Sequence, residues 1–220
     1  MVRGKMLPGF YETCRVVLKM LVFILTRCQV RGKENVPKQG SLLIVANHIS
    51  STDPVLISVG LSRKIAFLAK EELFRSAFTN FFFRNFGAFP VHRGRINREA
   101  FNWASQVLAE GKVLLMFPEG GRSHNLQLQA GLLGSALIAS RSRVLILPVG
   151  VSGSEKIRGW TWWLSSRPRI LVNIGRPFSL PQVHSELTRA KLTESTHSIM
   201  THIAELLPPE YRGDYAGQGN

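Results

Sequence analysis

Cysteine and aspartate are scarce in this chain of 220 residues, which has two of each. Both cysteines, Cys14 and Cys28, fall in the N-terminal segment. On one helix they would lie roughly 21 Å apart, which is too far for an intramolecular disulfide. The chain therefore shows neither a disulfide framework nor a zinc-site pattern, and it fits a reducing, cytoplasmic setting.

Acidic residues are also few, because 14 Asp and Glu stand against 28 Lys and Arg, for a formal net charge of +14. A surface this basic attracts phosphates, whether of nucleic acids, anionic lipid headgroups or phosphorylated substrates. Hydrophobic residues make up 45% of the chain and its mean hydropathy is +0.04, so it is no disordered basic tail. Basic and apolar character together favour a protein of the anionic membrane surface over a nucleic-acid binder.

No uncharged run near the N-terminus approaches the roughly 20 residues of a membrane-spanning helix. The longest candidate, residues 20–26, is short, and the spacing of Glu12, Arg15 and Lys19 by three and four puts them on one face of a helix. This pattern is typical of a helix that lies in the membrane interface, peripheral or monotopic on the cytoplasmic face. An ordinary amphipathic helix packed on the domain remains an alternative. We expect residues 1–28 to form this membrane-associating helix.

Short apolar runs alternate with helical periodicity along the rest of the chain. Strands are expected at residues 41–46, 65–68, 88–91, 113–117, 144–147 and 169–174. Helices are expected at residues 54–62, 76–86, 97–109, 130–140 and over most of 181–207. This alternation predicts one α/β sandwich domain over residues 29–210, with a largely parallel or mixed central sheet. Residues 211–220 are expected to form a flexible tail.

The segment from Asn47 to Pro54 holds the most informative spacing, since His48 is the one histidine followed five residues later by an aspartate. A carboxylate that orients an imidazole makes a general base at neutral pH. Asp53 also has the position of a helix N-cap, with Pro54 as the first helical residue, and a carboxylate there can serve both roles. No second ligand stands at metal-binding spacing around His48.

Two further segments carry residues suited to phosphate. In Phe117–Ser123 the paired glycines Gly120 and Gly121 let a ligand approach the backbone, and Arg122 can grip a phosphate through two hydrogen bonds. Residues 87–95 form a strand that ends in a basic cluster at Arg93. Either segment alone is more often an ordinary turn or a solvated face.

Taken in this order, these segments resemble the glycerolipid acyltransferase family of phospholipid biosynthesis, whose type member is 1-acylglycerol-3-phosphate acyltransferase. The matching segments are Asn47–Asp53, similar to the family's NHxxxxD motif, residues 87–93, Phe117–Ser123, similar to FPEGTRS, residues 147–153 and the lead-in at 30–37. The resemblance covers residues 30–153 and implies a glycerol-3-phosphate acyltransferase-like fold. Gly121 replaces the threonine of FPEGTRS, Gln129 stands where a lysine is common, and His92 where an aspartate is common.

The resemblance assigns His48 as the general base and Asp53 as its orienting partner. It places Arg93, Glu119, Gly120, Gly121 and Arg122 at the acceptor, with the two arginines on its phosphate. It implies no cofactor and no metal. Acyl transfer from a thioester needs the alcohol to be deprotonated as it attacks, and no covalent enzyme intermediate is required, because the thioester is already activated.

The function implied is transfer of a fatty acyl group from acyl-CoA or acyl-ACP to the free hydroxyl of lysophosphatidic acid, which gives phosphatidic acid. The enzymatic alternative keeps this chemistry on another acceptor, such as glycerol-3-phosphate, another lysophospholipid or a lyso-aminolipid. The non-enzymatic alternative is a basic peripheral membrane-binding module, which would leave His48, Asp53 and the ordered motifs unexplained.

Overall fold

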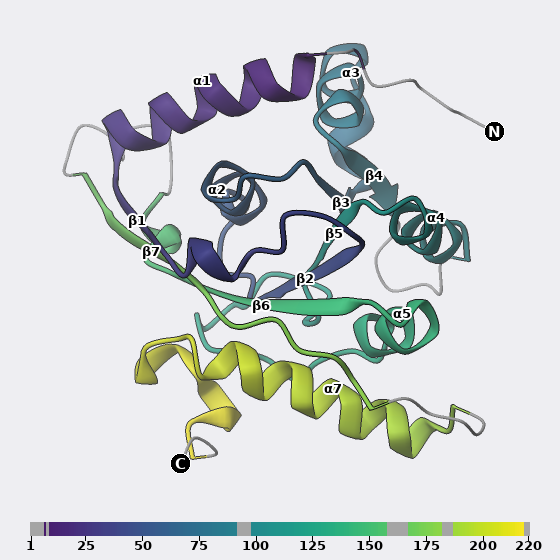
Figure 1. Ribbon diagram of the computed structural model, residues 1–220. Helices are drawn as coiled ribbons and strands as arrows, with labels where there is room; N and C mark the ends of the chain where they lie inside the picture. The colour runs from purple at the N-terminus through teal and green to yellow at the C-terminus, as the bar shows by residue number, and fades with distance from the viewer. Residues whose placement is uncertain (1–6, 8, 92–97, 158–166, 182–186, 218–220) are drawn as a thin grey trace.

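A seven-stranded sheet forms the centre of the chain in the computed structural model, which describes residues 7, 9–91, 98–157, 167–181 and 187–217 (Figure 1). The strand order is β1-β7-β6-β2-β5-β3-β4. The strands are β1 (Arg27–Arg31), β2 (Leu42–Ala46), β3 (Ile65–Lys70), β4 (Ala88–Val91), β5 (Val113–Met116), β6 (Leu145–Ser152) and β7 (Arg169–Ile174). All neighbouring pairs are parallel except β6 and β7. The predicted α/β sandwich with a mixed, largely parallel sheet is confirmed.

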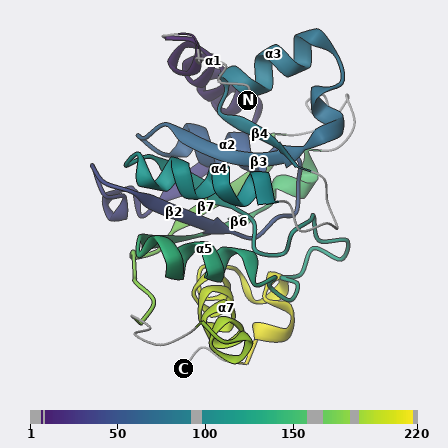
Figure 2. The same cartoon turned by 90° about the vertical axis from the view of Figure 1, so that its right-hand side faces the viewer.

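Helices cover both faces of this sheet (Figures 1 and 2). The α-helices are α1 (Phe10–Leu25), α2 (Asp53–Gly60), α3 (Ala77–Asn85), α4 (Arg98–Ala109), α5 (Gly134–Ser142) and α7 (Arg189–Ala204). The short 3₁₀ helices are η1 (Lys33–Asn35), η2 (Glu71–Phe74), η3 (Ser154–Lys156), η4 (Pro209–Tyr211) and η5 (Gly213–Tyr215). Helices α1, α2 and α3 lie on one side of the sheet, and α4, α5 and α7 on the other.

The apolar core is split by the sheet into two layers. Every residue of β2 is fully buried, because a central parallel strand covered by helices has no solvent face. Leu42, Ile44 and Ala46 point into the layer under α1 and α2, while Leu43 and Val45 point into the layer above α4, α5 and α7. The apolar run that predicted this strand therefore packs on both of its faces.

The edge strand β1 is absent from the sequence-based prediction, which placed residues 27 and 28 in the N-terminal helix and assigned no strand to residues 29–31. Its residues alternate between exposed and half-buried positions, and it pairs in parallel with β7, more than 130 residues later in the chain. The alternation is too short and too polar to reveal a strand by itself, so the pairing partner decides its conformation.

Several boundaries also differ from the predictions. Helix α5 begins at Gly134 and not at residue 130, and α7 begins at Arg189, later than residue 181. Residues 211–217 are not a free tail, because Tyr211 and Tyr215 pack against the apolar layer that α4, α5 and α7 cover. Residues 218–220 lie outside the described part of the chain.

Helix α1 has three different faces. Its core face, with Cys14, Leu18 and Val22, packs on the domain. Glu12 and Arg15 form an ion pair along one edge, and Arg15 also donates a hydrogen bond to the carbonyl of Leu61. The remaining face carries exposed apolar side chains: Val16, Val17, Met20, Leu21, Phe23 and Ile24. In the residues that the structure describes, no helix is both long and apolar enough to cross a bilayer.

Candidate functional site

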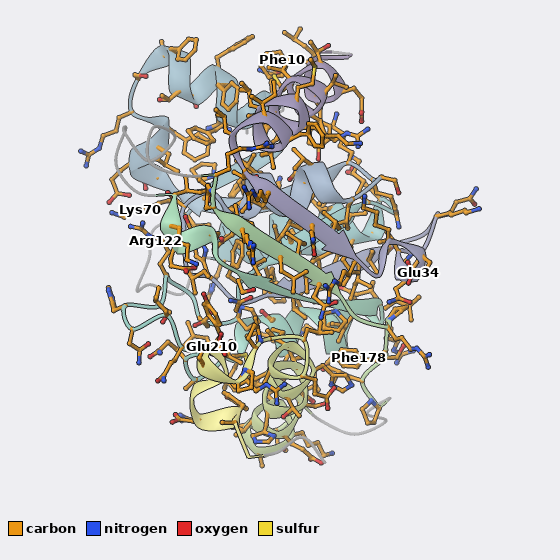
Figure 3. The ribbon with its side chains drawn as sticks, turned by 90° about the vertical axis from the view of Figure 1, so that its left-hand side faces the viewer. Phe10, Glu34, Lys70, Arg122, Phe178 and Glu210 are labelled. Atoms are coloured by element: carbon orange, nitrogen blue, oxygen red, sulfur yellow. The ribbon has the colours of Figure 1, made fainter. Side chains whose placement is uncertain are left out.

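The candidate site lies where parallel strands end at one edge of the sheet. Strands β2, β3, β5 and β6 run in the same direction, so the residues that follow them meet at this edge. His48 follows β2, Lys70 ends β3, Glu119 follows β5 and Ser154 follows β6. Figure 3 shows Lys70 and Arg122 on the same side of the molecule, away from Glu34 at the opposite side.

His48 and Asp53 form a buried pair. Nδ1 of His48 lies 2.8 Å from Oδ2 of Asp53, and the two side chains are 8% and 0% exposed. Oδ2 also accepts hydrogen bonds from the backbone N–H groups of Ile49 and Ser50, both at 2.8 Å. Because the two backbone N–H groups make Oδ2 an acceptor, the geometry suits Nδ1 of His48 as a third donor, and in a neutral ring Nε2 then keeps its lone pair. This is the tautomer that a general base needs.

Asp53 is the first residue of α2 and not its N-cap, which is Thr52. Its carboxylate turns back toward the loop between β2 and α2 and accepts from the backbone of that loop. The second oxygen, Oδ1, accepts a 2.6 Å hydrogen bond from the hydroxyl of Ser154. The carboxylate of Asp53 therefore accepts four hydrogen bonds. These bonds offset the free-energy cost of burying its charge.

The FPEGGRS segment holds the main chain of His48. The backbone N–H of His48 donates to Oε1 of Glu119 at 2.7 Å, and its carbonyl accepts from the N–H of Ser123 at 2.7 Å. The ring of Phe117 stacks on the imidazole, with centroids 4.1 Å apart and planes 20° apart. One short segment thus fixes both the backbone and the ring plane of His48.

Glu119 is a structural carboxylate of the site and not a free ligand. Oε1 accepts from His48 and Oε2 from the N–H of Gln129 at 2.9 Å. Burial raises the pKa of the Glu119 carboxyl to about 7, although the two backbone N–H donors pull this pKa down. The sequence placed Glu119 at the acceptor. In the structure both of its carboxylate oxygens accept hydrogen bonds from the backbone of the loops that form the site.

Gly120 and Gly121 lie in the turn of this segment. Gly120 has a φ of +69°, and a Cβ at this position would collide with Leu132. Gly121 follows it and is half-buried. Arg122 is exposed, and among the described residues no hydrogen bond or ion pair of its guanidinium is seen, so it is available to an anion at this edge. Arg93, the other predicted phosphate ligand, lies outside the described residues.

Three residues of the site were not singled out from the sequence. The side-chain amide of Asn47 donates to the carbonyl of Val151 and accepts from its N–H, which joins the ends of β2 and β6. Ser154 reaches Asp53 from 101 residues away. Lys70 pairs with Val91 in the register of β3 and β4, so it lies beside the strand that leads to Arg93. The predicted strand ended at residue 68, whereas β3 extends to Lys70, so the sequence did not mark Lys70 as a strand end.

No three potential metal ligands of the His, Cys, Asp and Glu types gather anywhere in the described ranges of the chain. The four donors on Asp53 and the two on Glu119 are backbone N–H groups, a hydroxyl and an imidazole. Together these groups form a hydrogen-bond network around His48.

Comparisons with known proteins agree with this geometry. Residues 27–152 match the protein family described as Acyltransferase, which covers more than half of the chain. The chain belongs to this family, as its motifs predicted.

Three relatives that are similar in sequence share the name 1-acyl-sn-glycerol-3-phosphate acyltransferase. The 1-acyl-sn-glycerol-3-phosphate acyltransferase of Streptococcus pneumoniae is 30% identical over 79% of this chain, and that of Bacillus subtilis is 25% identical over 89%. The chain spans 64% of the length of the first and 96% of the second. A third, from Borreliella burgdorferi, is 33% identical over 54% of this chain and is matched over 49% of its own length.

A solved structure supports the fold. The crystal structure of the 1-acyl-sn-glycerophosphate acyltransferase PlsC from Thermotoga maritima superimposes with a TM-score of 0.66 at 24% identity. The match covers 94% of this chain and 83% of that chain. At this identity the likeness is one of fold.

The raised pKa of Glu119 predicts a pH dependence of folding. Because the folded state holds the proton more tightly than the unfolded chain, this carboxyl contributes stability that is full below pH 4.5 and is lost as the pH rises through about 7. Denaturant unfolding between pH 5 and 8 should therefore show a fall in stability that is absent in Glu119→Gln. Equal slopes in the two proteins would contradict the assignment.

Proposed function

We propose that this chain is a lysophosphatidic acid acyltransferase that uses His48 as its base. The observation that carries the proposal is the buried Nδ1–Oδ2 hydrogen bond between His48 and Asp53, at 2.8 Å, within an acyltransferase-family domain. The names of the curated relatives favour 1-acyl-sn-glycerol-3-phosphate as the acceptor. The donor is an acyl thioester, acyl-CoA or acyl-ACP.

The reaction needs one proton transfer at the attacking oxygen. Nε2 of His48 accepts the proton of the lipid hydroxyl as its oxygen bonds to the thioester carbonyl carbon. The C–S bond breaks, and the departing thiolate takes the proton from the imidazolium. Asp53 stabilises this imidazolium and holds the ring in the productive tautomer. No covalent enzyme intermediate is required, because the thioester is already activated.

Substitution of the base is the first test. His48→Ala should lower the turnover number by about a thousandfold or more, and Asp53→Asn should also be severe, because the tautomer of His48 is then no longer enforced. Thiol release from acyl-CoA and acyl-ACP in the presence of lysophosphatidic acid measures both effects.

His197→Ala is the matched control, because His197 is an exposed histidine on α7. It should retain wild-type turnover, and thermal unfolding should show that His48→Ala still folds. Near-wild-type turnover of a folded His48→Ala protein would refute the mechanism.

The acceptor phosphate is proposed to bind the cations at the strand-end edge. Arg122 is exposed at this edge, and its planar guanidinium suits two parallel hydrogen bonds to a phosphate. Lys70, which pairs with Glu72 at 2.9 Å, adds a second positive charge, and Arg93 follows the neighbouring strand. The net charge of +14 raises the local concentration of such an anionic substrate.

An acceptor panel tests this assignment. Arg122→Ala should raise the KM for lysophosphatidic acid by about tenfold with a smaller effect on turnover, because it removes ground-state binding of the terminal phosphate. Arg189→Ala, an exposed arginine at the start of α7, is the control. If wild-type protein prefers lysophosphatidylcholine, or if Arg122→Ala leaves the KM unchanged, the proposed acceptor or its proposed ligand is wrong.

Membrane attachment is proposed to use the exposed apolar face of α1. Met20, Phe23 and Ile24 are 59%, 75% and 59% exposed, which is unusual for large apolar side chains that share one helix face. The core face of the same helix fixes it to the domain, so attachment to a bilayer is peripheral. The basic surface favours anionic lipid, and the free cysteines Cys14 and Cys28 suit the cytoplasmic side.

Vesicle sedimentation tests this face. Ile24→Asp should weaken binding to vesicles that contain phosphatidylglycerol by about tenfold, because a charge replaces apolar area at the interface. Asn102→Asp changes the net charge equally on the exposed side of α4 and should bind as wild type. An equal loss in both variants would mean that charge, and not the α1 face, determines binding.

A further inference from the structure

The two residues of the base pair are each supported by a loop from elsewhere in the chain. The main chain of His48 is held by Glu119, whose second oxygen accepts from the N–H of Gln129. The carboxylate of Asp53 is held by the hydroxyl of Ser154. The positions of His48 and Asp53 therefore depend on these two supporting segments.

Tyr211, in the C-terminal 3₁₀ helix η4, bonds to the immediate neighbour of each support. Its carbonyl accepts a 2.8 Å hydrogen bond from the N–H of Leu128, next to Gln129. Its hydroxyl donates to Oε1 of Glu155 at 3.0 Å, next to Ser154. One residue thus links the support of His48 to the support of Asp53.

The environment of Glu155 makes this contact important. Within the described part of the chain, its second oxygen Oε2 is buried without a hydrogen-bond partner. The hydroxyl of Tyr211 is therefore the donor seen for this carboxylate. Loss of the hydroxyl would leave a half-buried carboxylate unpaired, and its move toward water would carry Ser154, its neighbour in η3, away from Asp53.

The backbone that follows Tyr211 also packs closely against Leu128, the neighbour of Gln129. Gly213 has a φ of +54°, and a Cβ there would lie 2.6 Å from the carbonyl oxygen of Leu128. Arg212 donates from Nε to the carbonyl of Leu207, which holds the segment against the end of α7. Figure 3 places Glu210, the residue before Tyr211, on the same side of the molecule as Arg122 and Lys70. Residues 209–215 are a fixed strap at the site.

We infer that Tyr211 is a positioning residue of the acyl transfer, which acts through Glu155 and Leu128 to hold Asp53 and His48 in line. This inference rests on the proposed function, since it assumes that His48 is the base. It assigns a role in turnover to a C-terminal segment beyond the four motifs and the family match, which ends at residue 152.

Tyr211→Phe tests the inference, because it removes one hydroxyl and keeps the ring and the carbonyl. Turnover should fall by about tenfold while the KM values for lysophosphatidic acid and the thioester stay within twofold, because a displaced base costs rate and not binding. Tyr11→Phe is the matched control. Tyr11 is a buried residue of α1, and its hydroxyl accepts from the N–H of Ile65, so the loss of this hydroxyl should reduce stability without lowering turnover.

The Glu155 variants separate positioning from a general loss of folding. Glu155→Gln keeps an acceptor for Tyr211 and should retain at least about half of the turnover, whereas Glu155→Ala removes this acceptor and should retain less turnover than Glu155→Gln. In the double variant Tyr211→Phe/Glu155→Gln the loss should be smaller than in Tyr211→Phe, because no unpaired carboxylate remains. The comparison of Glu155→Gln with Glu155→Ala can be made even if Tyr211→Phe is too unstable to assay.

A measurement that does not depend on activity distinguishes this inference from the proposed function. The low-field NMR signal of the His48 Nδ1 proton reports the hydrogen bond to Asp53 whether or not His48 is the base. The signal should broaden in Tyr211→Phe, because the proton then exchanges faster with water, and it should stay unchanged in Tyr11→Phe. An unchanged signal, or a loss of turnover shared by Tyr11→Phe, overturns the inference. Full turnover in a folded His48→Ala protein overturns the proposed function and, with it, the role of Tyr211 in turnover.

Discussion

The buried carboxylate of Asp53 is the constraint on which the site depends. A fully buried negative charge is tolerated because four hydrogen-bond donors surround it: the imidazole of His48, two backbone N–H groups and the hydroxyl of Ser154. The same bonds close the loop after β2 and orient the ring. Stability and reactivity therefore rest on one group, and removal of any donor leaves part of the charge unsatisfied.

The mixed sheet explains how donors from distant segments reach this carboxylate. Parallel neighbours bring the ends of β2, β5 and β6 to one edge, so that residues 71 to 104 positions apart in sequence become adjacent. Asn47 locks two of these ends together by bonding both backbone groups of Val151. The segments from β2 to α2 and from β6 to η3 are short, and they hold polar side chains in fixed directions.

Much of the fold and part of the site were predictable. The apolar run of β2 and the strand–helix alternation led to the correct sheet class, and the spacing of His48 and Asp53 led to a pair that the structure brings into contact. Glu119 was singled out from the sequence, but its bonds to the backbone of His48 and Gln129 were not predicted, because backbone donors leave no trace in residue types. Strand β1 was missed because its alternating polar residues acquire a strand conformation only by pairing with β7.

By itself the sequence determined the local chemistry: a base and its carboxylate five residues apart, a turn that needs glycine at Gly120, a basic surface and an amphipathic first helix. These features depend on residue type and short spacing, which the chain encodes directly. The tertiary structure decided which groups support them. Ser154 and Tyr211 have roles that follow from contacts across the sheet edge, and such contacts depend on strand order and direction, which no short stretch of sequence contains.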